Sequence, residues 1–381
     1  MLGVFQLKKI IFITGTRADY GKIKPLLQSI SKNKMFEVYI YTTGMHLLES
    51  RGSTYNEIKK DGYERVYIAK ENMPTGNSSI DIAVTISNLT KYILDINPDA
   101  IIVHGDRPDA LAGAIVGAFN NIRVIHIEGG EISGTIDESI RHSISKLAHF
   151  HFVANEEAKQ RLILLGENQE CIRVIGSPDI DIIKSVNLPS LKSIKDHYGI
   201  DFENYGIMLF HPVTTEVDFI QKQIEIIIKA CQNSKKNFIV IYPNNDLGSH
   251  YIIDAYHELE SDNHFKIFPS IRFESFIVLL KNAEFLIGNS SAGVREAPYF
   301  GIDTIDIGSR QHGRYNIEKE KTITHVEYDI KEIEHAILSI QKYESVDTIW
   351  GDGNSAELFM KAITNPEFWT MPLQKKLTYD L

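Results

Sequence analysis

The sequence predicts an α/β protein with two doubly wound domains, each built on a parallel sheet. The length of 381 residues exceeds what one hydrophobic core ordinarily serves, so two domains are expected. Short runs rich in β-branched and aromatic residues alternate with helical stretches, a pattern typical of βα units. The alternation stops at Leu188, Pro189 and Ser190 and then starts again. We therefore expect a first domain over residues 1–180 and a second over residues 190–365.

The composition narrows the class of protein. Hydrophobic residues make up 43% of the chain and charged residues 24%, as in an ordinary soluble globular protein. The net charge of −10, without a basic run, argues against nucleic acid as a partner. Cys171 and Cys231 lie far apart without metal-ligand spacing, which predicts a reduced, cytoplasmic protein and no metal cluster. No signal peptide or membrane segment is expected, because lysines interrupt the apolar N-terminus and no apolar run is long enough to span a bilayer.

The first strand and its turn have the arrangement of an anion-binding site. Residues 10–14 form a β-branched and aromatic run, which predicts a buried parallel strand. The turn GTRADYGK and a helix follow, and such a turn offers backbone N–H groups to phosphate. Arg17 in this turn is a candidate for contacting a diphosphate, with pairing to a surface acid as the alternative. The turn is not a GxGxxG, so the fingerprint of dinucleotide binding is absent.

The rest of the first domain continues the same alternation. A strand and turn, EVYIYTTGMH, precede a helix over residues 80–93 that Asn97-Pro98 ends, and AIIVHGDRPDALAGAIVGAF is another strand–turn–helix. Asp106 lies just past that strand, where an N-cap is the ordinary role. We expect HFHFVAN to be a strand, residues 156–165 a helix and CIRVIGSPDID a strand.

The stretch from His126 to Ala148 concentrates charged groups in one strand–loop–helix unit. IRVIHIE is a short apolar strand, and GGEISG is a flexible turn in which glycine lets the backbone approach a ligand. Thr135 with Glu138 fits a capping box, so a helix is expected to begin there. Its apolar stripe is expected to comprise Ile136, Ile140, Ile144 and Leu147, with Asp137, Arg141 and Ser145 beside it.

Carboxylates gather around this unit. Glu128 and Glu131 come from the strand end and the turn, and Asp137 comes from the first turn of the helix. Proton transfer uses such groups, because mutual repulsion raises some of their pKa values. For Asp137 the alternative is that it only complements the helix dipole. Arg17, Asp106 and Glu128 all fall at the carboxyl ends of strands, where doubly wound sheets bind their ligands.

The second domain carries its candidate groups in three turns. His211 ends the strand YGIMLFHP, and Asn244 follows the strand NFIVIYPN, where it is placed to read the edge of a base or sugar. Ser290 and Ser291 precede a helix, which they are expected to cap or to turn into a diphosphate site. Glu296, further along that helix, is a candidate acceptor for ribose hydroxyls. A cleft between the strand ends of two such domains favours a nucleotide-sugar ligand.

Five motifs resemble those of a known family: TGTRADYGKIKPLL, HGDRPDALAGA, HIEGGEISGTIDESIRHSISKLAHFH, FHPVTTE and IGNSSAGVREAP. The chain resembles the hydrolysing UDP-N-acetylglucosamine 2-epimerases of bacterial sialic acid (capsule) biosynthesis, from about Lys9 to Arg310. The resemblance implies the GT-B architecture, in which two Rossmann-like domains enclose an interdomain active-site cleft. It also implies a homo-oligomer, dimer or tetramer, and a C-terminal helix over about 366–381 that joins the first domain.

The resemblance assigns roles residue by residue. It implies that Arg17 contacts the diphosphate, while Asn244 remains a candidate from its position alone. The implied active-site groups are the acids Asp106, Glu128 and Asp137, the histidine His211 and, as the weaker candidate, Glu131. The implied UDP-binding groups are Ser290, Ser291, Glu296 and Arg310.

The implied reaction converts UDP-N-acetylglucosamine and water to N-acetylmannosamine and UDP, the first step of sialic acid synthesis. It requires no cofactor; no metal is assigned, and Mg²⁺ on the diphosphate is left open. The turn GTRADYG resembles the hydrolysing branch, whereas non-hydrolysing relatives carry a GTRPE-type turn. Four alternatives remain: a non-hydrolysing epimerase, a hydrolysing epimerase of a UDP-2,4-diacetamido sugar, a glycosyltransferase and a non-catalytic sensor.

Overall fold

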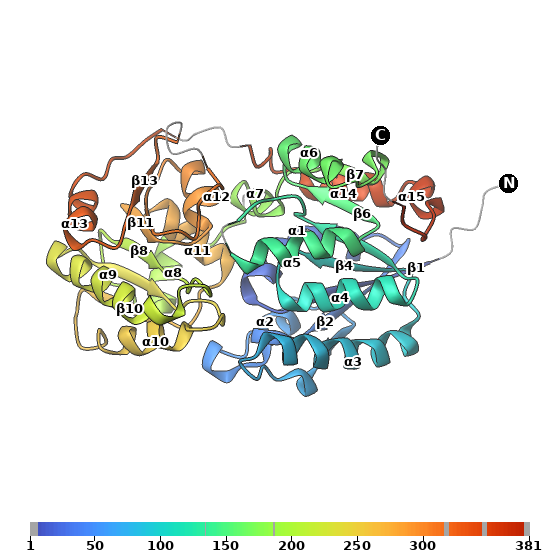
Figure 1. Cartoon of the computed structure of the whole chain (residues 1–381), viewed down its shortest axis with the longest axis horizontal. Helices are drawn as coiled ribbons and strands as arrows, with labels where there is room; N and C mark the ends of the chain where they lie inside the picture. The colour runs from blue at the N-terminus through green and yellow to red at the C-terminus, as the bar shows by residue number, and fades with distance from the viewer. Residues whose placement is uncertain (1–6, 134, 186, 316–319, 345–348, 377–381) are drawn as a thin grey trace. The chain divides into compact units, whose positions relative to one another are not determined.

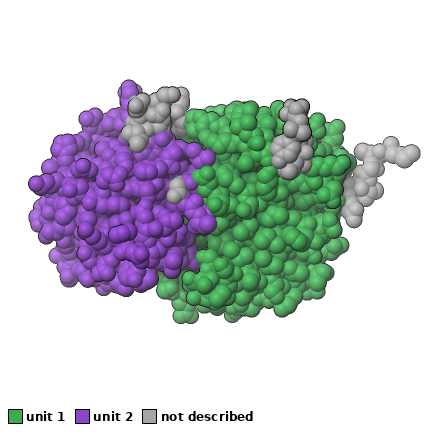
Figure 2. Space-filling view, viewed as in Figure 1, with its two compact units in different colours: residues 1–131, 137–185, 349–381 green, residues 132–136, 186–348 purple. Residues whose placement is uncertain are grey.

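The computed structural model describes residues 7–133, 135–185, 187–315, 320–344 and 349–376 (Figure 1). The chain forms two compact units, coloured separately in Figure 2. The first comprises residues 1–131, 137–185 and 349–381, and the second comprises residues 132–136 and 186–348. The second unit therefore ends before residue 365, where the sequence analysis ended the second domain. Within the described residues, no helix has both the length and the apolar character needed to cross a bilayer.

The first unit contains a parallel sheet of seven strands in the order β3-β2-β1-β4-β5-β6-β7. The winding direction reverses between β1 and β4, so the carboxyl ends of these two strands flank the switch point. The strands are β1 (Lys8–Thr14), β2 (Phe36–Thr42), β3 (Val66–Ile68), β4 (Ala100–His104), β5 (Arg123–Ile127), β6 (Phe150–Val153) and β7 (Ile172–Val174).

Helices cover both faces of this sheet. The helices of the first unit are α1 (Arg17–Ser31), α2 (Tyr55–Lys60), α3 (Ser78–Ile96), α4 (Pro108–Phe119), α5 (Ile136–Leu147), α6 (Glu156–Leu164), α7 (Pro178–Ile183), α14 (Ser355–Ile363) and α15 (Pro366–Thr370). Successive β1 side chains alternate between the faces, so Ile10 packs with α1 and α14 while Ile11 packs with α3, α4 and α5. Both faces are therefore buried, which explains the near-continuous apolar runs of the strands.

The second unit repeats this arrangement with six parallel strands in the order β10-β9-β8-β11-β12-β13. Its switch point lies between β8 and β11. The strands are β8 (Gly206–Leu209), β9 (Phe238–Ile241), β10 (Phe265–Phe268), β11 (Phe285–Gly288), β12 (Asp303–Ile307) and β13 (Ile323–Val326). The helices are α8 (Leu191–Tyr198), α9 (Ile220–Ser234), α10 (Ser249–His257), α11 (Phe273–Lys281), α12 (Ala292–Tyr299) and α13 (Ile330–Leu338). The predicted α/β class with two Rossmann-like, doubly wound domains is confirmed.

Two elements near the ends of the first unit differ from the prediction. The prediction of a strand over CIRVIGSPDID is wrong for the second half of this segment, because β7 stops at Val174 and α7 begins at Pro178. Proline suits the first helical position, where its missing N–H would have no helical partner. At the C-terminus, α15 covers only Pro366–Thr370 of the helix expected over about 366–381, and residues 377–381 lie outside the described residues.

Candidate active site

Glu128 lies directly after β5 with its carboxylate buried at the carboxyl edge of the sheet. Its φ of +61° is left-handed, a conformation that costs about 1–3 kcal/mol outside glycine and therefore needs support. The Glu128 N–H donates to Phe152 O at 2.8 Å, while the carboxylate accepts hydrogen bonds from His104 Nε2 at 3.1 Å and from the Ser177 hydroxyl. These contacts hold an anionic group in one orientation.

His104 and Ser177, which lie 24 and 49 residues away from Glu128 along the chain, were not predicted from the sequence. His104 is the last residue of β4, the neighbour of β5, and Ser177 lies in the turn before α7. The available signal was their position at or just after a strand end, in the segments HGD and GSPD.

Part of the buried face of α5 is polar. Asp137, Arg141 and Ser145 are 5%, 1% and 0% exposed, and their spacing of four residues places them along one side of the helix. In the predicted apolar stripe Ile144 is buried, but Ile136 is 50% exposed, so that part of the prediction is wrong. The helix begins at Ile136, directly after Thr135, as the capping-box pattern predicted.

The positive charge of Arg141 lies close to three of the predicted acids. Its guanidinium pairs with the Asp106 carboxylate and donates to the Glu131 carbonyl oxygen at 3.0 Å. Burial alone would lower the pKa of Arg141, but the charges of Asp106, Glu131 and Asp137 outweigh it and raise the pKa. The structure therefore brings these three acids together around a permanently charged arginine.

His126 supports the turn that carries Asp106. Burial lowers the pKa of His126 to about 3, so its imidazole is neutral. The ring donates from Nε2 to the Gly105 carbonyl oxygen at 2.8 Å, and Nδ1 lies 3.1 Å from the Ser145 hydroxyl, which donates to it. The Gly105 carbonyl oxygen can only accept, so it sets the tautomer of His126, and this hydrogen bond fixes the backbone next to Asp106.

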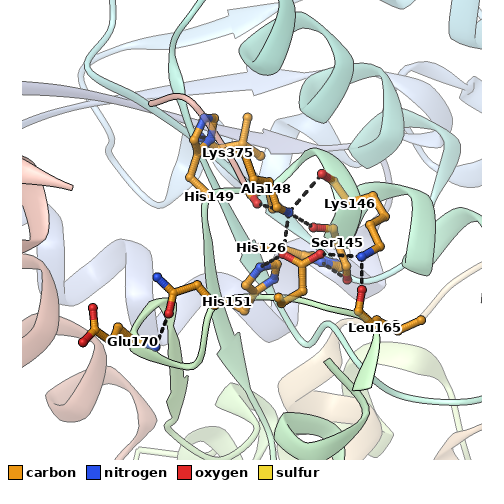
Figure 3. Close-up of polar contacts among 12 residues, drawn as sticks. His126, Ser145, Lys146, Ala148, His149, His151, Leu165, Glu170 and Lys375 are labelled. Carbon is orange, nitrogen blue, oxygen red and sulfur yellow. Dashed lines mark hydrogen bonds and ion pairs between the residues drawn. The ribbon is translucent and has the colours of Figure 1, made fainter. Parts of the chain in front are cut away.

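Lys375, in the C-terminal segment, binds the C-terminal end of α5 (Figure 3). The Lys375 ammonium donates to the carbonyl oxygens of Ser145, Lys146 and Ala148 at 2.7, 2.9 and 2.7 Å. It also pairs with Glu167 at 2.5 Å. A cation at a helix C-terminus neutralises the negative end of the helix dipole and satisfies carbonyl groups that have no helical partner. Lys375 therefore helps to fix the helix that presents Asp137.

The first turn uses two of its backbone N–H groups internally. The Gly15 and Thr16 N–H groups donate to the Asp19 carboxylate at 3.0 and 3.1 Å, and phosphate binding by this turn stays a prediction. Asp19 and Thr16 form a capping box, which the sequence analysis did not recognise. Arg17 pairs with Glu57, the kind of contact weighed as its alternative, although a guanidinium has five N–H donors to share. The diphosphate contact of Arg17 stays a prediction.

Asp109, in the first turn of α4, lies against Gly15. A Cβ on Gly15 would come within 2.0 Å of Asp109 Oδ2, so only glycine allows this approach. Burial, followed by the nearby charge of Asp19, raises the pKa of Asp109 to about 7. A carboxyl group that holds its proton near neutral pH therefore lies beneath the first turn.

Asn289 organises the candidate groups of the second unit. Its side chain accepts from the His211 N–H at 2.7 Å and donates to the His211 carbonyl oxygen at 2.8 Å. Its own carbonyl oxygen accepts hydrogen bonds from Arg310 at 3.1 Å and Gln311 at 2.7 Å. His211 follows β8 and Asn289 follows β11, the two strands at the switch point. The structure therefore brings His211 and Arg310 together through a buried residue that the sequence analysis did not select.

The end of β11, directly before Asn289, depends on a glycine. Gly288 has a φ of +135°, and a Cβ there would lie 2.2 Å from the Leu209 carbonyl oxygen. The close approach of β11 to the end of β8 brings Asn289 within reach of His211.

Asn244 sets the protonation of His211. The Asn244 N–H donates to His211 Nδ1 at 3.0 Å, so a neutral imidazole carries its proton on Nε2. The Asn244 side chain donates to Asp246 Oδ2 at 2.5 Å and accepts from the Asp246 N–H at 3.3 Å. These bonds close a local turn, and reading of a base or sugar by this amide stays a prediction.

The remaining predicted groups lie at α12 and, for Arg310, in the turn after β12. Ser290 accepts from the Ala292 N–H at 3.3 Å, as expected for a capping side chain, whereas Ser291 occupies the N-cap position without a side-chain cap bond. Glu296 is buried within the helix, and Arg310 is 7% exposed. The contacts of these four residues with UDP stay predictions.

Comparison with known proteins identifies the family. The family model described as UDP-N-acetylglucosamine 2-epimerase matches residues 28–364. A UDP-N-acetylglucosamine 2-epimerase of Neisseria meningitidis serogroup B is 46% identical over 375 residues, covering 97% of this chain and 98% of that protein. A hydrolysing UDP-N,N'-diacetylbacillosamine 2-epimerase of Legionella pneumophila is 37% identical over 81% of this chain and 83% of that protein.

A solved structure has the same fold. The UDP-GlcNAc 2-epimerase of Methanocaldococcus jannaschii, in complex with UDP-GlcNAc and UDP, matches with a TM-score of 0.78 at 21% identity, covering 93% of this chain and 99% of that chain. The length of the family match and the near-complete coverage of the relative from Neisseria meningitidis place this chain in the UDP-N-acetylglucosamine 2-epimerase family.

Proposed function

We propose that this chain is a hydrolysing UDP-N-acetylglucosamine 2-epimerase, which releases N-acetylmannosamine and UDP. The observation that carries the proposal is the buried Glu128 carboxylate, held by His104 and Ser177 at the end of β5. The acids around Arg141 add proton-transfer groups, which a nucleotide-sugar sensor does not need. The GTRADYG turn and the relative from Legionella pneumophila that is named as hydrolysing support the hydrolysing branch.

The chemistry of the substrate dictates the order of steps. The C2 hydrogen of N-acetylglucosamine is not acidic, since no carbonyl group adjoins C2. Departure of UDP builds positive charge at C1, which acidifies C2–H. The C1–O bond to UDP breaks, a carboxylate takes the C2 proton, and the electron pair forms the C1–C2 double bond of 2-acetamidoglucal. Water then adds its hydroxyl to C1, and a proton returns to C2 on the face that gives the manno configuration.

The first unit supplies the acids for these steps. Two donors stabilise Glu128 as an anion, which suits it to stabilising the positive charge at C1. The C2 proton and the activation of water fall to Asp106 and Asp137, whose charges Arg141 balances. Arg17 at the first turn is assigned to the diphosphate.

The second unit supplies the groups for the leaving UDP. His211 accepts an N–H at Nδ1, so it offers Nε2–H as a donor and has no second proton to give away. This favours a hydrogen bond to the diphosphate over protonation of the leaving group. Arg310, held by Asn289, and the start of α12 at Ser290 are assigned to the same anion.

Isotope labelling tests the proposed mechanism. With UDP-N-acetylglucosamine in D₂O, the released N-acetylmannosamine should carry deuterium at C2, and UDP should form in equal amount. In H₂¹⁸O with an early quench, the label should enter C1 of the sugar and not UDP, because the C1–O bond breaks. Accumulation of UDP-N-acetylmannosamine without free UDP would instead establish a non-hydrolysing epimerase, and ¹⁸O in UDP would exclude elimination.

A second candidate substrate is a UDP-2,4-diacetamido sugar, which the 37% identical relative from Legionella pneumophila favours. The two substrates differ at C4, while the elimination and hydration steps are the same. Parallel measurement of kcat/KM for both sugars by UDP release decides between them. If UDP-N-acetylglucosamine is preferred, its product supplies sialic acid synthesis.

A further inference from the structure

Two adjacent strands of the second unit place side by side a histidine and a carboxylate that are not among the groups assigned to UDP. In the parallel register of β12 and β13, Asp306 pairs with His325, so their side chains lie on the same face of the sheet. Glu327 follows His325 by two residues and returns to that face. The turn after β12, closed by a hydrogen bond from the His312 N–H to Ser309 O at 3.0 Å, brings His312 to the same place.

The distances among these side chains fit a shared cation. Ligand atoms of His312, His325 and Glu327 all lie within 4.8 Å of one another. His325 Nε2 and Glu327 Oε1 are 3.4 Å apart, and the two imidazole ring centroids are 5.2 Å apart. Tetrahedral Zn²⁺ with bonds of about 2.0–2.1 Å separates its ligand atoms by roughly 3.3 Å. Rotation of the exposed side chains of His312 and Glu327 would bring the ligand atoms to that separation.

A buried carboxylate orients the central histidine. His325 Nδ1 lies 3.3 Å from Asp306 Oδ2, which also accepts the Tyr315 hydroxyl at 2.7 Å. Asp306 is only 1% exposed, so its position is fixed by the sheet. When Nδ1–H donates to Asp306, the lone pair of Nε2 points toward Glu327. Carboxylate–histidine–metal chains of this kind are the usual support of zinc sites.

We propose that His312, His325 and Glu327 form a binding site for a divalent cation of the Zn²⁺ class. Two imidazole nitrogens and one carboxylate oxygen are ligands that Zn²⁺ prefers, whereas Mg²⁺ prefers oxygen ligands. The bound ion would tie the turn after β12 to the end of β13. The same turn carries Arg310 and Gln311, which bond to Asn289, so the ion would also restrain the segment that holds Arg310.

Calorimetric titration with ZnCl₂ tests the site. The protein should carry no polyhistidine tag and should be treated with EDTA and dialysed first. We expect one Zn²⁺ per chain with a dissociation constant on the order of micromolar, and no measurable heat with MgCl₂. His312→Ala and Glu327→Gln should each weaken binding at least about tenfold through loss of one ligand. His335→Ala, at an exposed histidine of α13, should bind like the wild type.

Two further measurements separate a loss of Zn²⁺ binding from a loss of folding. Asp306→Asn should weaken Zn²⁺ binding by about 10–100-fold while leaving all three ligands present, and circular dichroism will show whether it folds. Zn²⁺ should raise the melting temperature of the wild type and of His335→Ala, but not that of Glu327→Gln. His312 and Glu327 are exposed, so their variants test binding without disturbing the core. Absence of one-to-one Zn²⁺ binding, or equal binding by both ligand variants and the wild type, would overturn the proposal.

Discussion

His104 and Glu128 meet at the ends of neighbouring strands, with His104 Nε2 3.1 Å from the buried Glu128 carboxylate. We expect this contact to position Glu128 without taking part in proton transfer. His104→Leu should lower kcat about tenfold, the effect of about 1.4 kcal/mol at the transition state, with little change in KM. His104→Gln keeps an N–H near the position of Nε2 and should recover most of the activity. Equal loss in both variants would indicate that the imidazole itself reacts.

Substitution of the three proposed acids should lower kcat and leave UDP affinity almost unchanged, unlike substitution of groups that only bind UDP. Asp106→Asn, Glu128→Gln and Asp137→Asn should each reduce kcat at least about a hundredfold, the ordinary scale of general acid–base catalysis. UDP affinity, measured by calorimetry, should change little, because the groups assigned to UDP lie largely in the second unit. Near-normal turnover in all three variants would show that these carboxylates have been assigned wrongly.

Lys375 should contribute to stability more than its place near the C-terminus suggests. Lys375→Met removes the donor to three carbonyl oxygens at the end of α5 and one partner of the buried Glu167. We expect a loss of about 2 kcal/mol in the free energy of unfolding, measured by urea denaturation. Lys376→Met, at the exposed neighbouring residue, is the matched control and should behave like the wild type. Identical unfolding curves for both variants would contradict the anchoring role.

Asp109 should make stability depend on pH. Its pKa is raised from 3.8 to about 7, so between these values the folded protein holds a proton that the unfolded chain releases. The contribution of this group to stability is therefore present at low pH and is lost as pH rises toward 7. Asp109→Asn removes the dependence, so its stability relative to the wild type should increase between about pH 4 and pH 7 and level off above that range.

The control for this experiment is Asp95→Asn, at an exposed position of α3. Urea denaturation at several pH values should give a constant difference between this control and the wild type. A constant difference for Asp109→Asn as well would mean that Asp109 is ionised in the folded protein.

Local sequence patterns were sufficient for the strand ends and for several of the groups on them. Asp106, Glu128 and His211 each follow a short apolar run, so their place at a carboxyl edge could be read from nearby residues. The partners of these groups could not be read in the same way. Ser177 reaches Glu128 across 49 residues, and Asn289 reaches His211 across 78.

Helix α5 shows a second limit of pattern reading. Periodicity predicted that its isoleucines face the core, and Ile144 does. The neighbouring row of Asp137, Arg141 and Ser145 is buried as well, because Arg141 pairs with Asp106, just after β4, and donates to the Glu131 carbonyl oxygen in the turn after β5. Compensation of this kind depends on the fold and leaves no local signal. The same holds for His312 and His325, which only the register of the sheet brings together.

The first unit is discontinuous along the chain, because residues 349–381 belong with residues 1–131 and 137–185. A ribosome makes the whole of the second unit before it makes α14, α15 and Lys375. The six strands of the second sheet can therefore pair during synthesis, whereas the seven-stranded sheet is not fully covered until α14 and α15 have been made. Lys375, the anchor of α5, is made only after the whole of the second unit, so this helix becomes fixed later in synthesis than its own place in the chain suggests.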